Sequence, residues 1–375
     1  MNPVDQYLAS RLEERRLAGN LRKLKTERAE VDFFSNDYLG LVTSGKLAGV
    51  LQKSLAGKNT APGSTGSRLL SGNSLAAEEL ENRIAVFHQA EAALLFNSGY
   101  DANVGLLACI ASRNTTILSD QLCHASLIDG IRLSQCSRKY KFRHNDLNEL
   151  EGQLKKYTEY GPVIVVVESV YSMDGDLAPL QEMADLCTVS GAQLIVDEAH
   201  ATGVFGVKGE GLVGTLGLQD KVFARIHTFG KALGCHGAAV AGSALLKDYL
   251  VNFARTFIYT TALPAHALLA IDSAYRYLDS NSFSKKPLHE LIAYFRNTIN
   301  ESGMIGWKDS ISTIQALIVG ENNRCKQLAG QLQDARFQVN AILHPTVPAG
   351  MERLRVCLHT FNTKDEINRL FHILT

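Results

Sequence analysis

The chain has 375 residues, 46% of them hydrophobic, with 38 basic and 38 acidic side chains and no formal net charge at pH 7. This length predicts a large domain and a smaller one, and the lack of a basic excess argues against binding to nucleic acid or to an anionic membrane. No apolar run approaches the roughly 20 residues of a membrane-spanning helix, and the charged first residues predict no secretory signal. The seven cysteines include no C-x-x-C pair, which predicts reduced thiols, no metal site and a cytoplasmic protein.

At the start of the chain, leucines at helical spacing among charged residues predict an amphipathic surface helix from about Asp5 to Lys25. We expect residues 1–40 to form an N-terminal helical segment. Arg22 lies near the end of the predicted helix. It is either a solvated arginine, which the pattern alone favours, or an anchor for an anionic substrate.

Between about Leu75 and Leu246, short apolar runs alternate with segments of helical spacing. This alternation is typical of the α/β class, in which a parallel sheet lies between layers of helices. We expect a large domain over residues 41–270. The strands that the pattern indicates most clearly are Thr115–Asp120, Pro162–Ser169, Leu194–Val196 and Val222–Ile226.

After Pro264 the pattern changes to long helices and then to a mixture of strands and helices, which predicts a smaller α+β domain over residues 271–375. Thr363 and Glu366 have the spacing of a capping box for the last helix. Arg355 lies in a predicted strand. It is either an edge-strand charge or a group that grips a substrate carboxylate with two parallel hydrogen bonds.

Polar side chains follow two of the apolar strands directly. Asp197 and His200 come after Leu194–Val196, and Thr228 and Lys231 come after the next strand. Because the carboxyl ends of parallel strands meet at the ligand crevice, we expect these four side chains to converge. Pyridoxal phosphate (PLP) needs a lysine for its Schiff base and an acid that keeps its ring nitrogen protonated.

Lys231 would therefore bind the cofactor covalently, and Asp197 would pair with its ring nitrogen. His200 could hydrogen-bond the ring hydroxyl, and Thr228 could bind a phosphate oxygen. The D-E-A-H sequence from Asp197 to His200 is also found in helicases and Walker-B strands. That alternative is disfavoured because the chain has no G-x-x-x-x-G-K-[ST] loop.

Three further positions follow strands in the same way. His124 opens a helix, and its place beside the crevice favours a ring stacked on the cofactor over an ordinary structural histidine. Ser172 lies on the loop after Pro162–Ser169. Gly99 and Tyr100 stand where a strand passes into a helix, so their backbone N–H groups are available to a phosphate, although the Tyr100 ring is equally explained by packing.

Together these segments resemble the α-oxoamine synthases, which are fold-type-I PLP enzymes, along nearly the whole chain. The matching segments are NDYLGL, GSTGSRLLSG, SGYDAN, LCHASL, YSMDGD, DEAHATGVFG, TFGKALG, IYTTALP and PTVPAGMERLRV. The resemblance implies a large domain with a mostly parallel seven-stranded sheet between helices, and a smaller C-terminal α+β domain.

The resemblance also implies roles for individual residues. The catalytic set is Lys231, Asp197, His200 and His124, with the cofactor held further by Gly99, Tyr100, Ser172, Thr228 and Thr260. The residues that match substrate-binding positions are Arg22, Asn36, Thr346 and Arg355. Thr260 matches a phosphate contact made to the neighbouring subunit, so the resemblance implies a homodimer with shared active sites.

Within the family, the segment IQALIVGEN and the short ends favour the biotin-pathway member, which joins L-alanine to a pimeloyl group carried on coenzyme A or acyl carrier protein, with loss of CO2. The alternative is a relative that joins glycine to acetyl-CoA. A non-catalytic scaffold subunit is disfavoured by the presence of Lys231. The chain departs from the usual family pattern at Ala77, Glu198, Ala232 and Thr261–Leu263, and we expect these changes to affect the acyl preference more than the chemistry.

Overall fold

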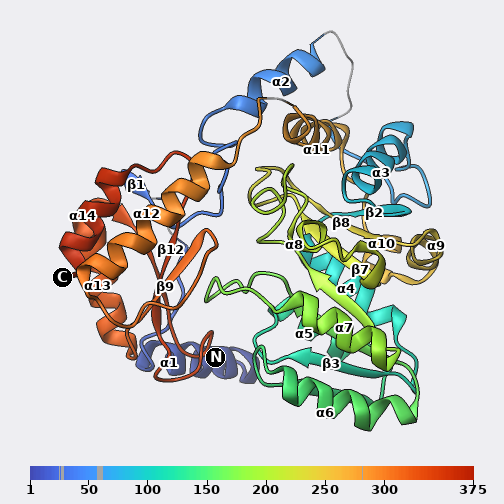
Figure 1. The fold of residues 1–375 in the computed structure, drawn as a ribbon, viewed down its shortest axis with the longest axis horizontal. Coiled ribbons are helices and arrows are strands. Elements are labelled where there is room, and N and C mark those ends of the chain that lie inside the picture. Colours follow the sequence, from blue (N-terminus) through green and yellow to red (C-terminus); the bar gives the residue numbers. More distant parts are fainter. Residues whose placement is uncertain (25, 27–28, 57–61, 281) are drawn as a thin grey trace. The chain divides into compact units, whose positions relative to one another are not determined.

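The structure is a computed structural model that describes residues 1–24, 26, 29–56, 62–280 and 282–375 (Figure 1). The chain forms two compact units. The larger unit comprises residues 36–172 and 177–285, and the smaller one residues 1–35, 173–176 and 286–375.

The larger unit is built on a seven-stranded sheet with the strand order β2-β8-β7-β6-β5-β3-β4. All neighbouring strands run parallel except at β8, which is antiparallel to both β2 and β7. The mostly parallel seven-stranded sheet expected from the resemblance is therefore confirmed. The strands are β2 (Ala92–Phe96), β3 (Thr116–Asp120), β4 (Arg138–Phe142), β5 (Val163–Glu168), β6 (Gln193–Asp197), β7 (Ala224–Thr228) and β8 (Ala238–Gly242).

Both faces of this sheet are buried, as the continuous apolar runs require. Ile164 and Val166 of β5 belong to a core shared with the helices α4, α5, α9 and α10. Val165 and Val167 point to the opposite face and are fully buried as well. The helices of this unit are α2 (Lys46–Leu55), α3 (Leu75–Phe87), α4 (Gly99–Ile110), α5 (Ala125–Leu133), α6 (Leu147–Tyr157), α7 (Leu180–Ser190), α8 (Leu212–Thr215), α9 (Ala244–Phe253), α10 (Arg255–Ile258) and α11 (Ala265–Leu278), with 3-10 turns at Thr158–Tyr160 and Gln219–Lys221.

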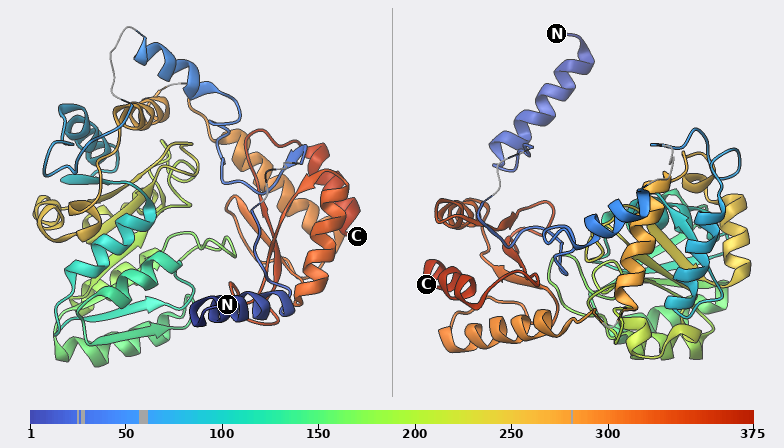
Figure 2. Two further views of the ribbon diagram at one scale, coloured as in Figure 1. Left: turned by 180° about the vertical axis from the view of Figure 1, so that it is seen from behind. Right: turned by 90° about the horizontal axis from the view of Figure 1, so that it is seen from above.

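The smaller unit contains an antiparallel sheet of order β11-β12-β9 and a parallel pair of β1 with β10. The helices α12 and α14 lie side by side (Figure 2), with the rings of Phe295 and Phe371 5.1 Å apart. Thr363 and Glu366 form the predicted capping box of α14. The elements are α1 (Pro3–Leu17), β1 (Val31–Asp32), α12 (Lys286–Ser302), β9 (Ile314–Ile318), α13 (Asn322–Asp334), β10 (Phe337–Gln338), β11 (Asn340–Ile342), β12 (Arg353–Cys357) and α14 (Lys364–Leu374).

The predicted domain limits differ from these units. Residues 1–35 share a unit with the C-terminal residues, because β1 pairs with β10. The larger unit extends past residue 270 to residue 285, because α11 packs on α2 and α3. Residues 173–176 belong to the smaller unit, where the buried Asp174 carboxylate forms an ion pair with Arg353 and the Gly175 carbonyl accepts a hydrogen bond from Ser310.

The predicted first helix was too long. It ends at Leu17, because Gly19 adopts a left-handed conformation with φ +64°, and Arg22 lies beyond it; Lys25, the predicted end, lies outside the described residues. No residue of α1 is buried, so the predicted amphipathic stripe covers no core within the smaller unit.

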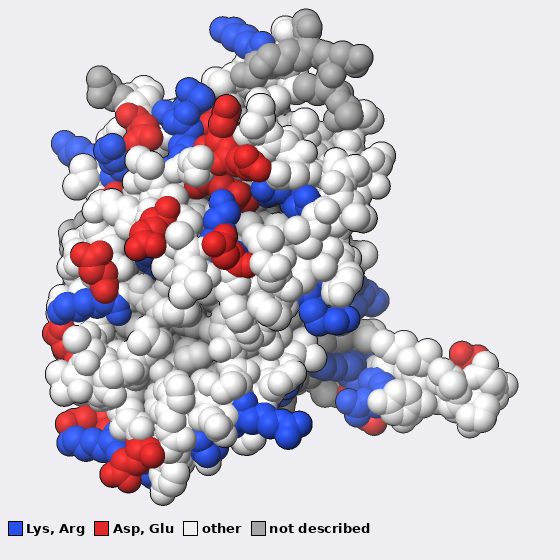
Figure 3. Space-filling model, turned by 90° about the vertical axis from the view of Figure 1, so that its right-hand side faces the viewer, with Lys and Arg blue, Asp and Glu red and all other residues white. Residues whose placement is uncertain are grey.

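The surface agrees with the balanced composition. Basic and acidic side chains are interspersed on the face shown in Figure 3. Among the described residues, no helix is long and apolar enough to cross a membrane. All seven cysteines are free thiols.

Candidate active site

The carboxyl ends of β5, β6 and β7 bring the predicted residues to one edge of the sheet. Glu168 at the end of β5 is the register partner of Asp197 at the end of β6, and Asp197 in turn is the partner of Ile226 on β7. Thr228 ends β7 at the same edge. Asp197 and Thr228 therefore lie at the ends of neighbouring strands on the same edge of the sheet.

The Asp197 carboxylate is buried and held by two donors. Its Oδ2 accepts a hydrogen bond of 2.7 Å from Asn103 Nδ2, and its Oδ1 accepts one of 2.9 Å from the backbone N–H of Ala199. These two hydrogen bonds fix the direction of the carboxylate.

Lys231 and His200 are in direct contact, with 2.7 Å between Lys231 Nζ and His200 Nε2. On the other side of the imidazole, His200 Nδ1 lies 2.7 Å from the hydroxyl of Tyr38, which donates a hydrogen bond of 3.0 Å to Asn36 Oδ1. Because a hydroxyl has one hydrogen, Tyr38 accepts from His200 Nδ1 in this arrangement, and His200 Nε2 is left to accept from the lysine. Tyr38, which sequence reasoning did not select, is fully buried.

His124 caps α5, as its predicted position at a helix start indicated. Its Nδ1 lies 2.7 Å from Ser126 Oγ, and its backbone N–H donates to Glu168 Oε1. Burial lowers the pKa of His124, with the nearby Lys231 acting in the same direction and Asp197 opposing it. Burial therefore favours the neutral form of the ring.

Glu168 was missed because it forms the last residue of an apolar strand. Its buried carboxyl accepts hydrogen bonds from the backbone N–H groups of His124 and Ser172, so it connects the two loops that carry them. Burial raises the pKa of Glu168 to about 8, and the neighbouring Asp197 carboxylate adds to the rise. The buried Ser172 lies directly after this strand, as predicted.

The raised pKa of Glu168 predicts a pH-dependent stability. The folded protein keeps a proton that the unfolded chain releases above its ordinary pKa of 4.5, so the free energy of unfolding falls as the pH rises through this pKa towards about 8. We expect Glu168→Gln to make the fall in the free energy of unfolding with pH less steep between about pH 6.5 and pH 8, by up to about 1.4 kcal/mol per pH unit.

The measurement is urea unfolding of the cofactor-free protein at several pH values. Glu182→Gln on the exposed side of α7 serves as the matched control and should keep the wild-type slope. A residual slope is expected from Glu198, whose pKa burial raises to about 7. An unchanged slope in Glu168→Gln would show that Glu168 is already ionised in the folded protein.

An anion-binding arrangement lies at the start of α4. Ser98 caps this helix by accepting from the N–H of Asp101, while the N–H groups of Gly99 and Tyr100 make no hydrogen bond within the described residues. The Thr228 hydroxyl oxygen is buried and also has no partner among them. A Cβ on Gly99 would lie 2.5 Å from Thr228 Cγ2, so only glycine allows this approach.

Tyr100 does not direct its hydroxyl to this arrangement, since it donates to Asp129 at 2.6 Å. Its ring is about half exposed. The predicted role of its backbone is compatible with the structure, whereas its side chain makes a separate surface contact.

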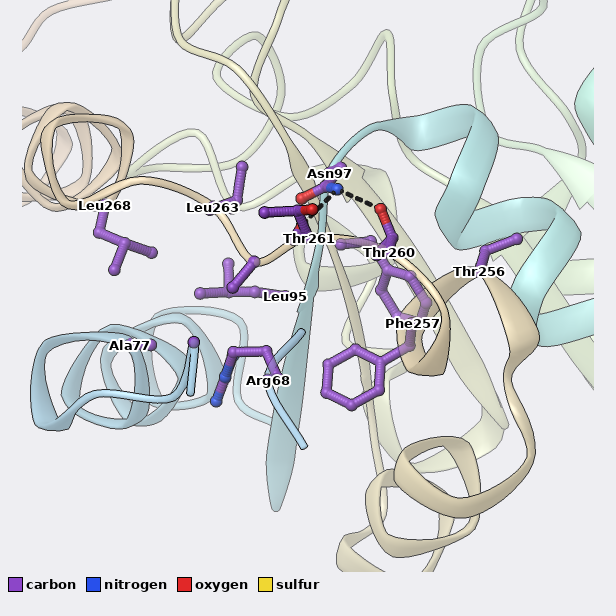
Figure 4. Close-up of a pocket in the computed structure, with 13 residues that line it drawn as sticks. Arg68, Ala77, Leu95, Asn97, Thr256, Phe257, Thr260, Thr261, Leu263 and Leu268 are labelled. Atoms are coloured by element: carbon purple, nitrogen blue, oxygen red, sulfur yellow. Dashed lines mark hydrogen bonds between the residues drawn. The ribbon is translucent and has the colours of Figure 1, made fainter. Parts of the chain in front are cut away.

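Thr260 lies at a different pocket of the larger unit (Figure 4). Asn97 Nδ2 donates to Thr260 Oγ1 at 2.8 Å and to the Thr261 carbonyl at 2.9 Å. Figure 4 also shows Arg68 and Phe257 at this pocket. Ala77, one of the family departures, lines it too.

The remaining predicted residues divide between the units. Asn36 belongs to the larger unit and contacts Tyr38, as described above. In the smaller unit, Arg22 Nη2 donates to Thr346 Oγ1 at 3.2 Å, so two residues 324 positions apart in the chain are brought together. Arg355 is buried on β12 between β11 and β9, so it is not an edge-strand charge, and it contacts Cys357 Sγ.

The polar groups at this edge of the larger unit match those that PLP needs for binding. It presents an amine at Lys231, a fixed carboxylate at Asp197, and unpaired N–H and hydroxyl groups for a phosphate at the start of α4 and at Thr228. No group of histidine, cysteine or carboxylate side chains that could hold a metal ion occurs in the described part of the chain. The arrangement is suited to organic cofactor chemistry at a lysine.

Comparisons with known proteins show the family to which the chain belongs. Residues 28–374 match the family "Aminotransferase class I and II". An 8-amino-7-oxononanoate synthase of Emericella nidulans is 43% identical over 370 residues, which cover 92% of this chain and 89% of that protein.

Two solved structures show the same fold. A lysine-to-alanine variant of a serine palmitoyltransferase from S. paucimobilis, solved with a bound PLP–myriocin aldimine, has a TM-score of 0.89 at 24% identity, and the match covers 100% of this chain and 97% of that chain. An 8-amino-7-oxononanoate synthase from Francisella tularensis has a TM-score of 0.78 at 28% identity, covering 92% and 96%. The chain therefore belongs to the class I and II aminotransferase family, and within it to the α-oxoamine synthases, which are PLP-dependent enzymes.

Proposed function

We propose that the protein acts as an 8-amino-7-oxononanoate synthase, which condenses L-alanine with a pimeloyl thioester and releases CO2 in biotin biosynthesis. The observation that carries the proposal is the meeting of Lys231 with His200, at the sheet edge where the fixed Asp197 carboxylate also lies. The relatives from Emericella nidulans and Francisella tularensis bear this activity in their names.

In this proposal the larger unit holds the cofactor. Lys231 would be the covalent attachment point, Asp197 would pair with the ring nitrogen, His200 would contact the ring hydroxyl, and the His124 ring would stack on the cofactor. The N–H groups of Gly99 and Tyr100, together with the Thr228 hydroxyl, bind the phosphate. Ser172 lies close to the cofactor on the loop that Glu168 supports.

Bound PLP supplies an electron sink for the bond changes at the alanine Cα. The residues of the protein transfer protons and orient the reacting groups. Lys231 Nζ, when it is not covalently bound to the cofactor, would act as the general base for the Cα proton, and His200 Nε2, 2.7 Å from this amine, would accept a hydrogen bond that orients its lone pair. Tyr38 keeps the imidazole in place from the opposite side.

The substrate contacts are assigned from the family resemblance and from the contacts that these residues make in the structure. Arg355 and Asn36 are proposed to bind the amino acid, with the Arg355 guanidinium gripping its carboxylate by two parallel hydrogen bonds. Arg22 and Thr346, which contact each other, are proposed to bind substrate as a pair. The acyl carrier is coenzyme A or acyl carrier protein.

We also propose that the enzyme works as a cytoplasmic homodimer. Thr260 is then the residue that each subunit gives to the phosphate site of its neighbour. The Asn97 amide supports this assignment, because it holds the Thr260 side chain in one direction at the pocket of Figure 4.

A steady-state comparison tests the function. We expect kcat/KM for L-alanine with pimeloyl-CoA or pimeloyl-acyl carrier protein to exceed that for glycine with acetyl-CoA by at least about 100-fold, because the acyl chain is discriminated by several methylene contacts. The two pimeloyl carriers are assayed in parallel. A preference for glycine with acetyl-CoA would assign the protein to another α-oxoamine synthase activity.

A further inference from the structure

Two buried polar residues outside the predicted site connect its acid to its stacking histidine. Asn103 on α4 and Ser126 on α5 are almost completely buried, at 2% and 1% exposure. Asn103 Nδ2 donates one hydrogen to Asp197 Oδ2 at 2.7 Å and lies 2.9 Å from Ser126 Oγ. Ser126 Oγ in turn lies 2.7 Å from His124 Nδ1. The four side chains therefore form one continuous chain of hydrogen bonds.

The direction of each hydrogen bond follows from the chemistry of the groups. The Asn103 amide must turn its nitrogen towards Asp197, because the opposite orientation would set two acceptor oxygens 2.7 Å apart. The second amide hydrogen then goes to Ser126 Oγ, whose own hydrogen is left for His124 Nδ1.

The Asn103 Oδ1 atom shows what this arrangement costs. It is buried and has no hydrogen-bond partner among the described residues. A buried acceptor without a partner destabilises the fold, so the orientation is maintained by the two bonds that the amide nitrogen makes.

A second donor defines the protonation of the His124 ring. The backbone N–H of Ser126 also donates to His124 Nδ1, at 3.2 Å. Because a backbone N–H can only donate, Nδ1 must carry a lone pair, and the single proton of the neutral ring is on Nε2. Burial of His124 lowers its pKa, in agreement with a neutral ring.

We infer that Asn103 and Ser126 are positioning residues that orient the Asp197 carboxylate and hold His124 in its neutral Nε2–H form. The inference rests on the proposed cofactor site. A neutral imidazole can stack on a ring with a protonated nitrogen without like-charge repulsion, and one amide sets both the acid and, through Ser126, the stacked ring. A substitution at Asn103 should therefore affect both the Asp197 contact and the His124 contact to the cofactor.

The first experiment uses the cofactor-free protein and does not depend on its activity. Two-bond ¹H–¹⁵N NMR correlations report which nitrogen of a histidine carries the proton, and the His124→Gln variant identifies the signals of His124 by their loss. We expect a neutral ring protonated at Nε2 at pH 7. A ring protonated at Nδ1, or on both nitrogens, would overturn the inference whether or not the enzyme is a synthase.

The second experiment tests the connection. In Ser126→Ala the Nδ1 resonance of His124 should shift, because one of its two donors is lost while the backbone N–H remains. Asn103→Leu, which preserves side-chain volume, should weaken PLP binding about 10-fold or more, since the buried Asp197 loses a charge-assisted hydrogen bond. PLP binding is followed by absorbance titration, and the visible band is also titrated with pH.

Cys109→Ala, on the same helix as Asn103 but outside this chain of hydrogen bonds, is the control and should bind PLP like the wild type.

The effects of Asn103→Leu and Ser126→Ala on the His124 resonance should be non-additive in the double variant. Additive effects, or unchanged PLP affinity and pH midpoint in Asn103→Leu, would contradict the inference. If Asn103→Leu does not fold, an unshifted His124 resonance in Ser126→Ala would contradict it instead. A wild type that does not bind PLP at all would reject the proposed function, while the tautomer measurement would still stand.

Discussion

Replacing Lys231 by alanine is expected to abolish turnover, with a loss on the order of 10⁴-fold or more in kcat, because one amine serves both as the cofactor's covalent attachment point and as the general base. The variant should also lose the visible absorbance of the covalently bound cofactor. His200 loses its contact with Lys231 Nζ but keeps the one with Tyr38, so the fold should persist.

Lys221→Ala is the matched control for this experiment. Lys221 lies in the same unit, and its ion pair with Asp185 is exposed on the surface. The control should retain the absorbance and the turnover of the wild type. Turnover in Lys231→Ala within about tenfold of the wild type would refute the assignment of the catalytic amine, since loss of general-base catalysis alone typically costs 10²–10⁴-fold.

The second large effect is expected at Asp197. In Asp197→Asn the negative charge beside the ring nitrogen is lost, and the new amide must also face the donors of Asn103 and Ala199. We expect kcat to fall by about 10²–10³-fold, the size typical of losing a fixed group that stabilises developing charge in a buried site. Steady-state rates at saturating PLP separate this effect from weaker cofactor binding.

Asp279→Asn serves as its control, because the Asp279 carboxylate is partly exposed and pairs with Lys208 on the surface. This control should behave like the wild type. A value of kcat within threefold of the wild type in Asp197→Asn would mean that another group keeps the ring nitrogen protonated.

Several of the predicted site residues stand at or directly after the ends of regular strands. Asp197 and Thr228 could be placed because the apolar runs before them define strands, and parallel strands present their carboxyl ends together. The structure places Lys231 at His200, as the pairing of the two strand ends required.

The residues that were missed depend on contacts distant in sequence. Tyr38 lies on an irregular segment and reaches His200 over 162 positions, and Asn103 reaches Asp197 over 94. Glu168 reads as the end of a buried strand, and its hydrogen bonds to the backbone N–H groups of His124 and Ser172 leave no trace in the local pattern. These residues become visible only once the fold is known.

Some parts of the fold could not be predicted from the sequence either. The run AAVAG of β8 is short and made of small residues, so nothing in it indicates a strand that runs against its neighbours. The end of α1 depends on the conformation of Gly19 rather than on the leucine spacing, which continues past it. The pairing of β1 with β10, which assigns the N-terminal residues to the smaller unit, is a contact across about 300 positions.

We propose that Lys231, Asp197, His200 and His124 form one site for PLP and L-alanine. The most direct test is an absorbance titration of the purified, cofactor-free protein with PLP, followed by additions of L-alanine and of glycine in parallel. We expect a saturable visible band at one PLP per chain, which L-alanine perturbs at lower concentration than glycine. A protein that stays colourless in the presence of PLP, or a band that neither amino acid changes, would contradict the account.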